Sequence, residues 1–340
     1  MLKSKIIKAL SEIGYQTDHF TENALKNAID YETDDRAKDI LKLLCQNINI
    51  AKEKNFPLCQ DTGSVIFWVK VFFKKNLKIF NSKFFILNSI LNDAVNIAFK
   101  NNNYRASIVN DPIKRKNTTD NTPPIIHYEF IPLKEYKKSS SSIKACKSSS
   151  SYKACKSSSS CKACLVKTKK VKKKNYPLSI IHYPFSVANY LDISIMLKGG
   201  GSENMSALKM LKPADGIKGI RDFVLKVVKE AGGNACPPLT VGIGIGGNFE
   251  TCALLAKKSL FREHDKKNPD PFWAIEEDYL LNEINKLGIG PLGLGGNTTA
   301  LKVNIEVKPC HIASLPVAVN LECHAHRVIS NLIKNNKLIY

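Results

Sequence analysis

A nine-residue repeat near the middle of the chain sets the strongest limit on how its 340 residues can fold. Three copies run through residues 138–164, reading KSSSSIKAC, KSSSSYKAC and KSSSSCKAC, and a lysine-rich stretch follows them. A segment of serines and lysines buries too little apolar surface to offset the entropy lost on ordering. We therefore predict a disordered, low-complexity insertion over residues 134–174, within a single domain that spans residues 1–340.

The insertion carries most of the positive charge. The whole chain has a formal net charge of +21, and residues 134–174 supply +13 of it. The basic residues are 45 Lys and only 6 Arg, whereas proteins that read nucleic acids rely on the bidentate Arg side chain. A polybasic protein that binds nucleic acid or a membrane surface is therefore a remote alternative, and neither partner is expected.

Apolar periodicity outside the insertion predicts a mixed α/β fold, with N-terminal helices followed by interleaved strands and helices. The first 50 residues have helical spacing, and the third helix is expected to bury Ile40, Leu43, Leu44 and Ile48. The run SVIFWVKVFF predicts a buried strand, and residues 203–232 are predicted to be helical. The strand-like segments PIIHYEFIPL and YLDISIMLK flank the insertion, which is therefore expected to enlarge a turn between two strands.

Ten cysteines are unusual for a chain that has no secretion signal. The N-terminus lacks the apolar stretch and cleavage site of a signal peptide, and no apolar run reaches the ~18 residues of a membrane helix. A disulfide framework is typical of short secreted domains, so we expect a reducing compartment, the cytoplasm. Four cysteines belong to the repeat, and the pair Cys161 and Cys164 is open to interpretation as a zinc knuckle or as repeat expansion.

Three other cysteines lie in polar loops, where thiols often act as metal ligands or nucleophiles. Cys59 is in PLCQDTG, Cys236 is in NACPP and Cys323 is in ECHAHR. Cys45 and Cys252, by contrast, stand beside apolar residues of predicted helices and are expected in the core. The spacing of the three loop cysteines does not show whether they meet in the fold.

A glycine pattern and two polar side chains leave further alternatives open. Gly242, Gly244 and Gly247 match the G-x-G-x-x-G fingerprint between a predicted strand and helix, so a nicotinamide-dependent oxidoreductase is one alternative. The same glycines could serve anion binding at a helix start or close packing. His311, at a predicted strand end, and Arg105, in a polar loop, each fit a structural or a functional role.

Six motifs taken together resemble the iron–sulfur (class I) fumarate hydratase and L-tartrate dehydratase family, in its N-terminal region or α subunit. In chain order these motifs are PLCQDTG, YRASIVNDP with NTTDNTPP, KGGGSENMSALKMLKPADG, NACPPLTVGIGIGG, GPLGLGGNTTAL and HIASLPVAVNLECHAHR. The resemblance implies a hydro-lyase that hydrates fumarate to malate, and the alternative is dehydration of L-tartrate. It covers nearly the whole chain outside the insertion.

The same resemblance implies a 4Fe–4S cluster held by Cys59, Cys236 and Cys323, with one iron left open to act as a Lewis acid. Asp61 and His311 are the implied catalytic residues. Gln60, Arg105 and Gly200 are the implied substrate-binding residues, for a small dicarboxylate. The family's C-terminal catalytic domain has no counterpart in this chain, so the resemblance also implies a separate β subunit and a dimer of αβ pairs.

Overall fold

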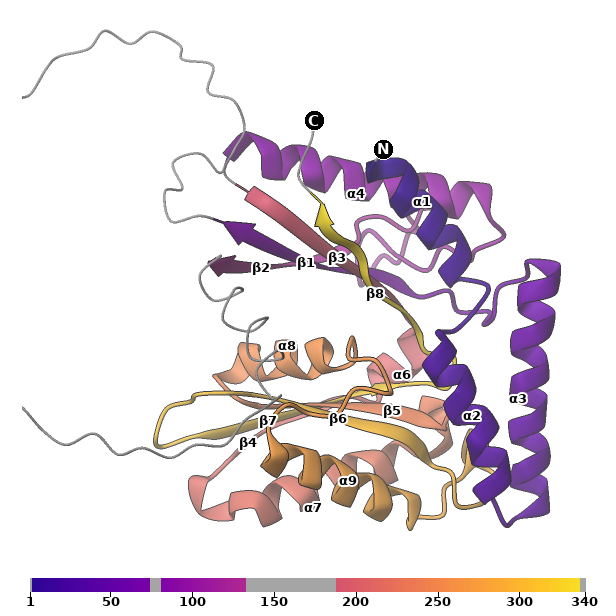
Figure 1. The fold of residues 1–340 in the computed structure, drawn as a ribbon, viewed down its shortest axis with the longest axis vertical. Helices are drawn as coiled ribbons and strands as arrows, with labels where there is room; N and C mark the ends of the chain where they lie inside the picture. The colour runs from indigo at the N-terminus through magenta and orange to yellow at the C-terminus, as the bar shows by residue number, and fades with distance from the viewer. Residues whose placement is uncertain (1, 74–80, 133–187, 337–340) are drawn as a thin grey trace, which may run out of the picture.

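The computed structural model describes residues 2–73, 81–132 and 188–336, and within them the fold is the predicted mixed α/β arrangement. The predicted insertion at 134–174, with its four repeat cysteines, lies outside these residues. Two four-stranded sheets alternate with layers of helices (Figure 1). No helix in the described part of the chain is long and apolar enough to cross a bilayer.

The first sheet has the strand order β2-β1-β3-β8. Helices α1 and α4 cover its outer face (Figure 1). The bounds of these elements are α1 Leu2–Ile13, β1 Ser64–Phe73, α4 Asn81–Asn101, β2 Ile125–Pro132, β3 Ala188–Lys198 and β8 Arg327–Asn336. Strand β1 is central and almost wholly buried, which confirms the buried strand predicted from its β-branched and aromatic residues.

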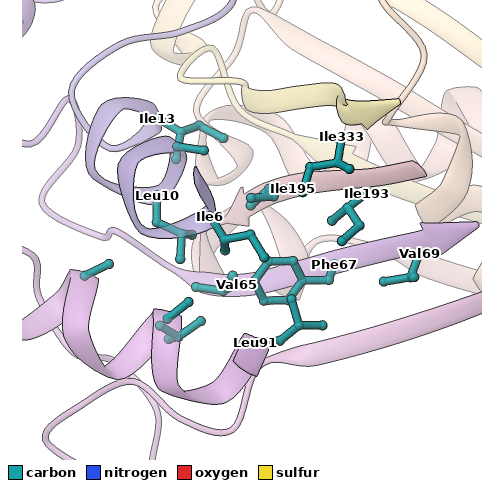
Figure 2. Packing of buried hydrophobic residues seen from close by; sticks show 14 of the residues in the cluster. Ile6, Leu10, Ile13, Val65, Phe67, Val69, Leu91, Ile193, Ile195 and Ile333 are labelled. Carbon is teal, nitrogen blue, oxygen red and sulfur yellow. The ribbon is translucent and has the colours of Figure 1, made fainter. Parts of the chain in front are cut away.

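Helix α1 packs on this sheet through one apolar stripe (Figure 2). Ile6, Leu10 and Ile13 follow a helical spacing of three and four residues, which places them on one face. Figure 2 shows them beside Phe67 of β1 and Ile195 of β3. Each such side chain, once fully buried, contributes about 1.5–3 kcal/mol of transfer free energy, so this stripe holds α1 on the sheet.

The second sheet has the strand order β4-β7-β5-β6. Helix α8 lies between the two sheets, while α7 and α9 cover the far face of the second (Figure 1). The bounds are α6 Gly200–Asn204, β4 Ala207–Leu211, η1 Pro213–Asp215, α7 Gly216–Ala231, η2 Gly232–Ala235, β5 Leu239–Gly246, α8 Phe249–Ser259, α9 Pro271–Asn285, η3 Pro291–Gly293, β6 Ala300–Lys308 and β7 Leu315–Glu322.

Helices α2 and α3, spanning His19–Tyr31 and Asp35–Lys54, form a pair beside both sheets (Figure 1). The expectation that α3 buries Leu43 is wrong, because this side chain is 59% exposed. Leu41 is buried instead, together with Leu44 and Ile48. These three share one face of the helix, whereas residue 43 falls outside their stripe.

One other prediction needs correction. Residues 203–232 are not one helix, because Ala207–Leu211 forms β4, an edge strand that pairs with β7. Tertiary pairing decided this outcome, and local patterns do not show it. The two segments predicted to be strands on either side of the insertion correspond to β2 and β3, and β1 lies between these strands and pairs with both.

The glycine fingerprint serves close packing of α8 on β5. A Cβ atom on Gly242 would lie 2.4 Å from the carbonyl oxygen of Ala256, and one on Gly244 would lie 2.0 Å from that of Cys252. Both distances are far below contact, so only glycine lets the helix backbone come this near. Of the readings left open for this motif, packing is the one that these contacts support.

Candidate functional site

The three loop cysteines lie at the same end of the second sheet. Cys323 directly follows β7, and Cys236 shortly precedes β5. Because β5 and β7 are antiparallel, with Thr240 opposite Glu322, the start of one strand lies at the end of the other. Cys59 reaches the same place from the loop after α3, where it packs in the apolar cluster that contains Cys323.

Hydrogen bonds hold the second and third cysteine loops together. The His324 amide donates to the Cys236 carbonyl oxygen at 3.1 Å, and His324 Nδ1 lies 3.1 Å from the same atom. Cys236 itself has φ 55°, in the left-handed region that few non-glycine residues adopt. The turn thus presents this thiol through a constrained backbone conformation.

The environment of Cys236 and Cys323 disfavours the ionised forms of these two thiols. Burial, together with the Glu322 carboxylate, raises the pKa of the Cys323 thiol to about 12. Partial burial and the neighbouring Cys59 raise the pKa of Cys236. The thiols therefore influence one another electrostatically, and a cationic partner would be needed to ionise them together.

Asp61 connects the first cysteine loop to the glycine-rich turn before α6. Its Oδ2 accepts a 2.7 Å hydrogen bond from the Gly200 amide, and its Oδ1 accepts a 3.3 Å bond from the Ser107 hydroxyl. A Cβ atom on Gly200 would lie 3.6 Å from Oδ2. The carboxylate is only partly buried, so it is oriented by these donors and still accessible.

Arg105 and Gln60 border this position, and both are exposed. The backbone amide of Arg105 donates to the Thr62 hydroxyl at 3.2 Å, and the Arg105 guanidinium takes no part in this hydrogen bond. Asn121 holds the two loops together, since its Nδ2 donates to the Gly63 carbonyl oxygen and its Oδ1 accepts from the Ser107 amide. Polar side chains from three segments, together with the Gly200 amide, therefore meet beside the cysteines.

A buried ion pair lies behind the cysteines, and the sequence analysis missed it. The Lys198 and Glu322 side chains are 2% and 0% exposed, and Lys198 Nζ lies 3.1 Å from Glu322 Oε2. Lys198 also donates to the Ser202 hydroxyl at 2.6 Å. The pair links β7, at the residue before Cys323, to the KGGG turn. Its one visible signal was the position of the two charges, Lys198 directly before three glycines and Glu322 directly before Cys323.

His311 lies at the opposite end of the second sheet from the cysteines. It is exposed in the loop between β6 and β7, beside the turn where the Gly247 amide donates to the Pro309 carbonyl oxygen. Cys323 follows the other end of the eight-residue strand β7, which corresponds to about 25 Å. The structure thus brings every other predicted site residue together and does not bring His311 to them within one chain.

The donor set suits a polynuclear cluster better than a single ion. Among the described residues, no three His, Cys, Asp or Glu side chains gather closely enough to hold one metal ion. In an iron–sulfur cluster each thiolate binds a different iron, so the ligands need not converge on one point. Cysteines from three loops that are tied together, near a buried guanidinium nitrogen of Arg327 without a partner, fit such a group.

Comparison with known proteins identifies the class of enzyme. The family model described as fumarate hydratase (Fumerase) matches residues 3–148 and 144–331. The "Putative L(+)-tartrate dehydratase subunit alpha" of Methanocaldococcus jannaschii is 35% identical over 329 residues, covering 97% of this chain and 96% of the relative. The L(+)-tartrate dehydratase subunit alpha of Escherichia coli K12 is 29% identical over 308 residues, covering 89% and 81%.

These matches define a hydro-lyase. The chain belongs to the fumarate hydratase (Fumerase) family and corresponds, along almost its whole length, to an alpha subunit. The family and the subunit type predicted from the six motifs are therefore confirmed.

Proposed function

We propose that this chain is the α subunit of a 4Fe–4S hydro-lyase that acts on a four-carbon dicarboxylate. The meeting of Cys59, Cys236 and Cys323 at one end of the second sheet carries the proposal. Two reactions fit, namely hydration of fumarate to malate and dehydration of L-tartrate. The family description favours the first, and the names of the two relatives favour the second.

In this proposal the three cysteines hold the cluster. When bound, the cluster would supply an iron atom without a protein ligand, which polarises a substrate hydroxyl as a Lewis acid. Asp61 is the proposed acid that passes a proton to or from the substrate. Its carboxylate is already oriented by the Gly200 amide, so little reorganisation is needed at the moment of proton transfer.

The remaining residues of the site bind the substrate. The Arg105 side chain is exposed and can clamp a substrate carboxylate through its bidentate fork. Gln60 follows the first cysteine and can donate a hydrogen bond to the same anion. Gly200 has no side chain, so a ligand can come close to the backbone next to Asp61.

A separate β subunit is proposed to complete the site, with αβ pairs forming a dimer. This chain purified alone is expected to show less than about 1% of the activity of the αβ complex, since positioning groups would be missing. The measurement is anaerobic turnover of fumarate, malate and L-tartrate by the chain with and without its β subunit. Normal turnover by the chain alone would contradict the proposal, and the ratio of kcat/KM values identifies the substrate.

The cytoplasm is the proposed location, because a cluster and free thiols need reducing conditions.

His311 can act in catalysis only if it serves the site of another α subunit in that dimer. Neither a Cys59→Ser enzyme nor a His311→Asn enzyme is then expected to be active, because one lacks the cluster and the other lacks the histidine. Co-expression of the two variants should restore up to about a quarter of wild-type activity, since mixed dimers contain one intact site. In purified mixed dimers, selected with two affinity tags, one intact site of two corresponds to about half of wild-type activity, and this is the measurement. Activity no higher than that of the parents would remove His311 from the site.

A further inference from the structure

Arg327 is a fully buried cation without a carboxylate partner. It is the first residue of β8, directly after the turn that follows Cys323, and it is 1% exposed. Nε donates to the Ala325 carbonyl oxygen at 3.2 Å, and Nη2 donates to the Asp61 carbonyl oxygen at 3.0 Å. Nη1 has no hydrogen-bond partner among the described residues, and no carboxylate there lies within 4 Å of the guanidinium. Two neutral carbonyl groups therefore make all of its polar contacts.

Three other cations of the described chain, which are buried or partly buried, each have a carboxylate partner. Arg262 lies 2.6 Å from Glu277, Arg221 lies 2.7 Å from Glu276, and Lys198 is paired with Glu322. Burying a charge without a counter-charge costs several kcal/mol, so folded proteins rarely keep one without a purpose. Arg327 is more deeply buried than Arg262 or Arg221, so its lack of an anion needs an explanation.

The surroundings of Arg327 point to the anion that would complete it. It bridges the Cys59–Asp61 loop to the turn that follows Cys323, and so joins two of the three cysteine loops. Three thiolates that bind a cluster would place negative charge in this region, where the unpaired Nη1 is located.

We propose that Arg327 is the charge-compensating and positioning residue for the anionic, thiolate-bound cluster. The inference rests on the proposed function, because it needs the cluster that the three cysteines would hold. It assigns to Arg327 two effects, which are neutralising the ligand charge and fixing the distance between the first and third cysteine loops. No contact of Arg327 with the substrate is required.

The test compares Arg327→Met and Arg327→Lys with the wild-type full chain, all purified anaerobically. Arg262→Met is the matched control, because it removes the same kind of side chain from an ion pair elsewhere. Arg327→Met is expected to lose iron to a chelator roughly 10- to 100-fold faster, the usual effect of removing a residue that supports metal ligands. Its cluster midpoint potential should become more negative, since loss of a nearby cation disfavours the added electron. Arg327→Lys should recover much of both properties.

The stability of the cluster-free chain separates the proposed role from a merely structural one. Under the proposal, removing the unpaired cation of Arg327 should destabilise this chain less than removing Arg262, whose loss leaves Glu277 buried without its cation. A merely structural role predicts that the Arg327 variant is the less stable of the two. An Arg327→Met chain that unfolds more readily than Arg262→Met without a cluster would therefore overturn the inference. So would unchanged iron retention and potential with weaker fumarate or L-tartrate binding, which would make Arg327 a substrate ligand. A wild-type chain that binds no iron and sulfide would instead refute the proposed function itself.

Discussion

Replacing Cys59, Cys236 or Cys323 with serine is expected to eliminate iron and sulfide binding and to lower dehydratase activity about a thousandfold or more. Serine keeps the size of the side chain but replaces the thiolate, which is the ligand that iron–sulfur clusters require. Loss of a Lewis acid worth several kcal/mol in the transition state corresponds to a rate loss of this order. Anaerobic iron and sulfide analysis, together with the absorbance at about 400 nm that thiolate-bound clusters show, provides the measurement.

Cys252→Ser is the matched control for this series. Cys252 is a fully buried thiol on α8, where its Sγ contacts the Phe249 carbonyl oxygen, and it lies outside the three loops. We expect this variant to retain its cluster and its activity, with at most a modest loss of stability. Stoichiometric zinc in the wild-type chain, or full cluster content in all three loop variants, would contradict the assignment.

The sequence was sufficient to predict elements that flank two of the cysteine loops. Strand β1 has β-branched and aromatic residues throughout, and helix α7 ends at Gly232, whose φ of 49° suits a glycine cap. Cys59, Cys236 and Cys323 stood out because they interrupt apolar patterns with polar loops. Local patterns of this kind survive folding because they reflect which face of an element is buried.

Contacts between distant segments could not be predicted in the same way. Nothing near Lys198 in the sequence shows that it meets Glu322, which is 124 positions further along the chain. The burial of Arg327 depends on its carbonyl contact with Asp61, and the separation of His311 depends on the direction of β7. Such features arise from sheet topology, and a single sequence does not encode topology in any local pattern.

Lys198→Met is expected to lower the free energy of unfolding by about 3–5 kcal/mol, the largest stability effect we predict. The substitution leaves the Glu322 carboxylate fully buried without its cation, and this uncompensated charge is the source of the loss. The contact is a charge contact at 3.1 Å, since Glu322 Oε2 makes no aligned hydrogen bond. Urea unfolding of the full chain, followed by circular dichroism, measures the change.

The double variant Lys198→Met with Glu322→Gln separates loss of the pair from loss of one charge. It should regain part of the stability, because a neutral amide is cheaper to bury than a carboxylate. Lys218→Met is the surface control, since Lys218 and Asp222 form an exposed pair at 2.5 Å that should contribute little to stability. If Lys198→Met cost no more than this control, the buried pair would not hold β7 to the glycine-rich turn. The turn beside Asp61 would then be positioned by the Gly200 amide contact and by the hydrogen bonds of Glu203 and Ser206 to β7.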